Sequence, residues 1–161
     1  MSKIDRRRVL ATALGASAAF FGVAEAQGPD TPNIALVKSL YAAFGKGDVA
    51  TIVAACAPDV DWITVGSAGD FPTFGPRKGP VGVQEFFNLV GSNLEFSEFT
   101  PKDFYPVGDK VFVLGRYAMK VKKTGKPMQS DWLHVFTIAD GKVKAFSEFL
   151  DTARAVEAFR S

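Results

Sequence analysis

Residues 128–151, which read MQSDWLHVFTIADGKVKAFSEFLD, decide the fold. From Trp132 to Ile138, every second residue is aromatic, apolar or histidine, so these side chains share one face of an extended strand. Asp140-Gly141 follows as a turn, and a second alternating segment begins directly after it. The pattern predicts a β-hairpin with strands over residues 128–139 and 142–151.

Further strands precede this hairpin. Residues 96–106 and 110–122 alternate in the same way, and a shorter run from Val60 to Gly66 also has a strand pattern. Gly108-Asp109 and Thr124-Gly125 supply the turns between the later strands. Strands that follow one another through such short turns predict an antiparallel sheet.

The first part of the chain has a helical period instead. Thr31 can cap a first helix, and Gly45 ends it. The other predicted elements are a short helix over residues 48–56, a long loop over 66–80, a third helix over 81–93 and a C-terminal helix over 152–159. Helices followed by a run of antiparallel strands predict an α+β fold rather than a parallel βαβ fold.

Three segments carry a more specific signal. They are LYAAF at residues 40–44 followed by Gly47-Asp48, then GPRKG at 75–79 leading into VQEFF at 83–87, and finally WLHVF at 132–136 continued by DGKV at 140–143 and EFLDT at 148–152. Together they resemble the SnoaL-like branch of the nuclear transport factor 2-like superfamily, which includes polyketide cyclases and ketosteroid isomerase.

This resemblance implies a cone-shaped α+β barrel, in which a strongly bent, mainly antiparallel sheet wraps three N-terminal helices. It places a single SnoaL-like domain over residues 32–159. It also implies an apolar small-molecule pocket inside the cone and a homodimer formed through the outer face of the sheet. Because this fold hosts many chemistries, the resemblance leaves the reaction open.

Steroid isomerisation is not expected. The steroid isomerases of this superfamily use a catalytic Asp on the first strand. In DWITVG, residues 61–66, the corresponding position falls at Thr64 or Val65. Neither side chain can take a proton from a carbon acid.

His134, the only histidine in the chain, is the first candidate for a catalytic acid/base group. Imidazole ordinarily titrates near neutral pH, which suits general acid/base catalysis. The alternative interpretation is a histidine that is satisfied by a hydrogen bond inside a packed sheet.

A carboxylate on the next strand would favour catalysis, and the turn decides which one faces His134. A two-residue Asp140-Gly141 turn would place Asp151 on that face, whereas a three-residue loop over 139–141 would place Glu148 there. We favour the three-residue loop, because Ala-Asp-Gly suits a type I turn followed by a left-handed Gly. The SnoaL-type pattern also has an acidic catalytic residue near Glu148.

Both carboxylates have structural alternatives. Glu148 could form a surface salt bridge with a lysine such as Lys144, and Asp151 could cap the C-terminal helix.

Six further side chains are candidates for the pocket wall. Five are aromatic, and the sixth, an arginine, could bind an anionic ligand; they are Tyr41, Trp62, Phe86, Arg116, Tyr117 and Trp132. Aromatic residues such as Tyr41, Trp62, Tyr117 and Trp132 are more often plain core than ligand contacts, and Arg116 could be solvated. With one histidine and one cysteine, we expect no metal site and no cofactor, and we expect Cys56 to be a buried structural thiol.

The first 26 residues predict export. Arg6–Arg8 precede an uncharged apolar run from Val9 to Ala24, which is shorter than the ~20 residues of a membrane-spanning helix. Ala24-Glu25-Ala26 then offers small residues for a signal peptidase. We expect a cleaved twin-arginine signal peptide over residues 1–26, a short tail over 27–31, and a periplasmic or secreted protein.

Cleavage would remove the net charge. Residues 1–26 hold four of the 19 basic and two of the 17 acidic side chains, which leaves 15 of each. We therefore expect neither a nucleic-acid partner, which needs a basic surface, nor a membrane partner after cleavage.

Three functions fit these observations. The first is a SnoaL-type enzyme with isomerase, cyclase or hydrolase chemistry on an apolar carbonyl compound. The second is a non-catalytic periplasmic protein that binds an apolar small molecule. The third is a dimeric scaffold with a filled cone.

Overall fold

A computed structural model describes residues 30–160, so the predicted signal peptide and residues 27–29 of the tail lie outside the described residues. The elements in chain order are α1 (Pro32–Gly45), α2 (Val49–Ala54), β1 (Cys56–Thr64), β2 (Gly75–Lys78), α3 (Gly79–Asn93), β3 (Leu94–Val107), β4 (Lys110–Val121), β5 (Pro127–Ala139), β6 (Lys142–Phe149) and α4 (Thr152–Phe159). None of the described helices has the length and apolar character needed to cross a membrane.

The helices begin where their capping residues predict. The Thr31 hydroxyl accepts a hydrogen bond from the Ile34 amide at 3.2 Å, and Pro32 occupies the first turn of α1. The Asp48 carboxylate accepts from the Thr51 amide at 3.0 Å and so caps α2.

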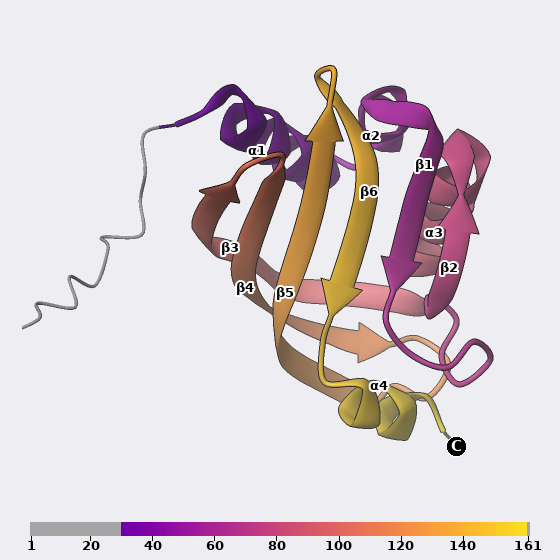
Figure 1. The fold of residues 1–161 in the computed structure, drawn as a ribbon. Helices are drawn as coiled ribbons and strands as arrows, with labels where there is room; N and C mark the ends of the chain where they lie inside the picture. The colour runs from indigo at the N-terminus through magenta and orange to yellow at the C-terminus, as the bar shows by residue number, and fades with distance from the viewer. Residues whose placement is uncertain (1–29, 161) are drawn as a thin grey trace, which may run out of the picture.

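The six strands form one sheet in the order β2-β1-β6-β5-β4-β3. Only β1 and β6 pair in parallel, and the other neighbours are antiparallel. Helices α1, α2 and α3 cover one face of the bent sheet, whereas α4 lies at the end of the sheet away from α2 (Figure 1). The predicted cone, with three N-terminal helices wrapped by a mainly antiparallel sheet, is therefore confirmed.

Two predicted boundaries were wrong in the segment between α1 and α3. Helix α2 ends at Ala54, and β1 begins at Cys56, because the Ala55 carbonyl accepts from the Val143 amide of β6 at 2.9 Å. The predicted loop over 66–80 also contains β2, which pairs with the end of β1. Both differences come from pairing between strands, and the start of β1 depends on the distant strand β6.

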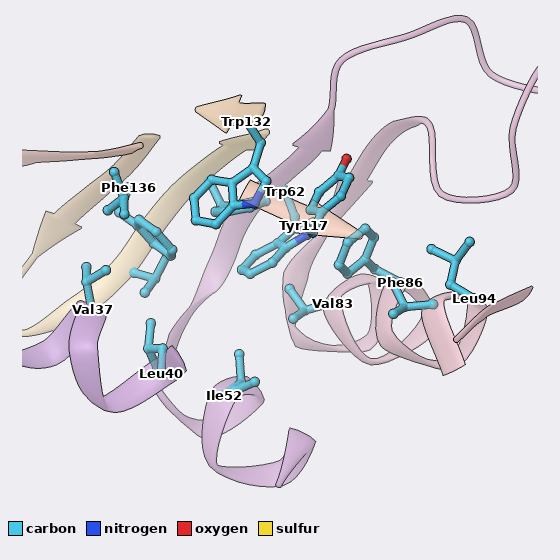
Figure 2. Packing of buried hydrophobic residues seen from close by; sticks show 14 of the residues in the cluster. Val37, Leu40, Ile52, Trp62, Val83, Phe86, Leu94, Tyr117, Trp132 and Phe136 are labelled. Atoms are coloured by element: carbon cyan, nitrogen blue, oxygen red, sulfur yellow. The ribbon is translucent and has the colours of Figure 1, made fainter. Parts of the chain in front are cut away.

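The core lies between the helices and the concave face of the sheet. Figure 2 shows Leu40, Ile52 and Phe86, from the three N-terminal helices, directed toward Trp62 and Trp132 of the sheet. Burying such large side chains supplies most of the stabilisation of a domain of this size.

Cys56 is buried at the edge of this core, as predicted. Its thiol donates to the Ile52 carbonyl at 3.4 Å, and burial raises its pKa to about 11. A thiol in such a setting stays protonated and unreactive, which is what a structural cysteine requires.

Candidate active site

Four polar side chains from four different elements form one hydrogen-bonded chain inside the cone. His134 Nε2 lies 3.3 Å from Glu148 Oε1, and His134 Nδ1 lies 3.0 Å from the Tyr41 hydroxyl. The Thr64 hydroxyl donates to Glu148 Oε2 at 2.8 Å. The hydrogen-bonded chain Tyr41–His134–Glu148–Thr64 therefore links α1, β5, β6 and β1.

The register between β5 and β6 brings His134 and Glu148 together as direct cross-strand partners. The favoured three-residue loop was wrong: Ala139 pairs with Lys142 across a two-residue turn in which both central residues have positive φ, 51° at Asp140 and 70° at Gly141. A β-bulge between Thr137 and Ile138 then shifts the pairing by one residue.

The bulge changes which carboxylate lies on the same face as His134. Regular pairing from this turn would have set Ser147 opposite His134, with Asp151 on the histidine's face. The extra residue in β6 returns Glu148 to that face. The sequence carried a weak signal for the bulge. The apolar residues Val143 and Phe146 are three positions apart, which breaks the alternation of a regular strand, and both are buried.

The pair is largely withdrawn from solvent. The side chains of His134 and Glu148 are 7% and 12% exposed, and Thr64 is fully buried. Burial, together with the charge of Glu148, raises the pKa of Tyr41 well above its usual value, and the same two causes raise the pKa of Tyr117. Both phenols therefore remain protonated at physiological pH.

Aromatic rings fix the orientation of the imidazole. The Trp132 ring stacks on His134 with centroids 3.9 Å apart and planes at 22°, and Phe146 meets it edge-on at 5.0 Å. The imidazole thus has little freedom to rotate away from Glu148 and Tyr41.

The polar chain opens onto an apolar cavity of about 80 Å³. More than half of the lining residues are aromatic, and the titratable ones are Tyr41, Tyr117, His134 and Glu148. No Lys or Arg lines it among the described residues.

A SnoaL-like domain model matches residues 37–146, which is more than half of the chain. The chain belongs to the SnoaL-like domain family. An uncharacterised protein of Mycobacterium tuberculosis (strain ATCC 25618 / H37Rv) is 26% identical over 137 residues, covering 81% of this chain and 97% of that protein.

Two solved structures share the cone. An NTF2-like protein from Burkholderia xenovorans LB400 has a TM-score of 0.72 and 28% identity, covering 80% of this chain and 96% of that one. TerC, co-crystallised with polyporic acid, has a TM-score of 0.72 and 29% identity, covering 81% of this chain and 100% of its own.

In this SnoaL-like domain, four of the six predicted pocket residues line the cavity: Tyr41, Trp62, Phe86 and Tyr117. Trp132 does not; it is buried behind the histidine, stacked on Phe99 with centroids 5.4 Å apart. It is therefore a support for His134 rather than part of the wall.

Arg116 was wrongly placed at the pocket. It lies on the outer face of β4, where it hydrogen-bonds Gln129 at 2.8 Å and approaches Asp131 at 3.6 Å and Glu98 at 3.9 Å. Arg116 shares this face with Phe112 and Leu114, and that face of the strand points away from the cone.

Asp151 also lies outside the polar chain. Its carboxylate caps α4 by accepting from the Arg154 amide at 3.0 Å, and it pairs with the Arg154 guanidinium at 3.0 Å. Of the two carboxylates considered for His134, Glu148 alone contacts it.

Thr64 was missed as a site residue. Its position was considered only as that of a missing base, yet its hydroxyl holds the far oxygen of Glu148. The contact depends on the parallel pairing of Thr64 with Glu148, 84 residues away, and no local pattern predicts that pairing. Among the described residues, no group of three His, Cys, Asp or Glu could hold a metal ion.

Proposed function

We propose that this SnoaL-like protein is an exported acid/base enzyme that moves a proton on an apolar carbonyl compound. Glu148 is the proton acceptor and His134 its partner. The buried His134–Glu148 pair at the wall of an apolar cavity carries the proposal. Such a pair costs free energy to desolvate, and a core needed only for stability would do as well with apolar side chains.

The carboxylate keeps room for a substrate proton. A carboxylate offers about four lone-pair positions. His134 and Thr64 occupy one position on each oxygen of Glu148. The remaining lone pairs can accept a proton from a C–H or O–H group of a molecule in the cavity.

The lining restricts the charge of that molecule. Without a Lys or Arg among the described lining residues, a phosphate or carboxylate would enter unpaired beside Glu148, which is unfavourable. An acidic hydroxyl group would therefore bind in its protonated form.

One residue of the cavity lining carries a buried hydrogen-bond donor. The Trp62 Nε1–H is buried and has no hydrogen-bond partner among the described residues, and Trp62 lines the cavity. An orphaned buried donor is costly. A ligand oxygen that reached it would recover that cost.

The cavity must widen for a ring-sized ligand, because 80 Å³ is below the several hundred Å³ of ordinary ligand pockets. Phe71 is the lining residue that we expect to move. It comes from the loop between β1 and β2 and rests on Phe159 of α4, with ring centroids 5.4 Å apart.

The small cavity favours one other candidate function, the scaffold with a filled cone. Thermal unfolding with a panel of ring ketones, steroids, polyketides, terpenoids and polyporic acid separates the two. We expect an uncharged carbonyl compound to raise the melting temperature, and its carboxylate-bearing analogue to have no effect. Absence of a shift with every compound would favour the scaffold.

Export is also proposed, on the basis of Arg6–Arg8 and the apolar run that follows. Replacing Arg6 and Arg7 by Lys should leave an uncleaved precursor in the cytoplasm, whereas the wild-type chain should begin at Gln27 outside it. Cell fractionation with intact-mass measurement gives both results. Unchanged export of the double variant would point to a general secretory signal.

The homodimer stays a prediction. Leu114, Leu133 and Phe149 are cross-strand partners in one row on the outer face of the sheet. Leu114 and Phe149 are 42% and 44% exposed, so this row is the surface that a second copy would cover.

A further inference from the structure

Tyr41 is the member of the polar chain for which acid/base chemistry gives no direct role. It lies on α1, and its hydroxyl is 3.0 Å from His134 Nδ1. Its ring is held among Phe99, Phe104 and Phe136, with centroids 5.8, 6.0 and 5.9 Å away. This packing fixes the hydroxyl at the histidine.

The direction of each hydrogen bond follows from the chemistry of the partners. An ionised carboxylate can only accept, so the hydrogen between His134 and Glu148 must sit on Nε2. A neutral imidazole carries one N–H, which leaves Nδ1 as an acceptor. Tyr41 must then donate to Nδ1, and its raised pKa keeps the phenol proton in place.

We infer that Tyr41 is a positioning residue that holds His134 in the neutral Nε2–H tautomer, with the imidazole proton directed at Glu148. Both ring nitrogens of His134 are then engaged by the protein. His134 acts on a substrate only through Glu148, by orienting its carboxylate and stabilising its charge.

The role in catalysis rests on the proposed function, but the tautomer does not. The competing arrangement places the proton on Nδ1 and makes the Tyr41 hydroxyl an acceptor, which would require a protonated Glu148 or an imidazolium. The two arrangements differ in whether Nδ1 carries a proton.

Nuclear magnetic resonance of ¹⁵N-histidine shows directly which ring nitrogens of His134 are protonated, because His134 is the only histidine in the chain. The protein is produced without a histidine tag, and long-range ¹H–¹⁵N correlations are recorded at neutral pH. We expect a protonated Nε2 and an unprotonated Nδ1 shifted by an accepted hydrogen bond. A protonated Nδ1 would overturn the inference.

Two matched variants test whether Tyr41 is responsible. Tyr41→Phe keeps the ring and removes the hydroxyl, so the Nδ1 resonance should move toward that of a nitrogen without a hydrogen bond, and the Nδ1–H tautomer should become detectable. Tyr117→Phe removes the other phenol of the same cavity and should leave both nitrogen signals unchanged. Unchanged signals in Tyr41→Phe would refute the assignment.

Failure of the tautomer assignment and failure of the proposed function can be told apart. If Tyr41→Phe does not fold, the wild-type spectrum alone decides the direction of the hydrogen bond. If the spectra agree with the inference but no proton transfer is catalysed, the proposed function fails and the tautomer assignment stands.

Discussion

Glutamine in place of Glu148 is expected to lower the rate of proton transfer by about 10²–10⁴-fold, the usual contribution of a general acid or base. The amide keeps the size of the side chain, and its oxygen can still accept from His134 while its NH2 group donates to the Thr64 hydroxyl, but it cannot take up a proton. Deuterium uptake from D₂O by a ketone that binds the protein measures the loss.

Asp151→Asn is the matched control, because it makes the same change at the carboxylate that caps α4. Asn is as good a helix cap as Asp, so stability should be preserved. Deuterium uptake should stay close to that of wild type, because the Asp151 carboxylate pairs with Arg154 and not with His134. Equal losses in both variants would contradict the assignment of Glu148.

Alanine in place of Gly115 is expected to lower the free energy of unfolding by about 3 kcal/mol, at the upper end for overpacked cores. A Cβ at this position would lie 2.1 Å from Cζ2 of the Trp132 indole, so the indole would have to move. Since Trp132 stacks on His134, its displacement should also disturb the imidazole. Urea unfolding gives the free energy, and the ¹⁵N spectrum reports the imidazole.

Gly91→Ala provides the comparison, because a Cβ at this position in α3 meets no atom within 4 Å. Alanine is the better helix former, so this variant should be more stable by roughly 0.5–1 kcal/mol. If Gly115→Ala unfolded no more easily than Gly91→Ala, the close packing of Trp132 on β4 would be wrong.

The sequence predicted those elements whose signals are local. Caps at Thr31 and Asp48 marked two helix starts, and alternation from Trp132 to Ile138 marked the central strand and its inward face. The family motifs then supplied the cone. What remained wrong, such as the start of β1 at Cys56, depends on pairing with distant strands.

The candidate site was likewise predicted only in part from local sequence. The prediction that Glu148 shares a face with His134 was correct, but the reason given for it was wrong. The two-residue turn and the bulge together orient Glu148 to the same side of the sheet as the expected three-residue loop would have done. Thr64 and the outward direction of Arg116 needed the sheet itself, since neither is set by neighbouring residues.

The most direct test of the account is deuterium exchange catalysed by the wild-type protein. A ring ketone that raises the melting temperature is incubated in D₂O with and without protein, and its mass is followed. We expect deuterium to be incorporated beside the carbonyl with the wild-type protein and not with Glu148→Gln. Binding without any catalysed exchange, or equal exchange in both proteins, would contradict an acid/base site at His134 and Glu148.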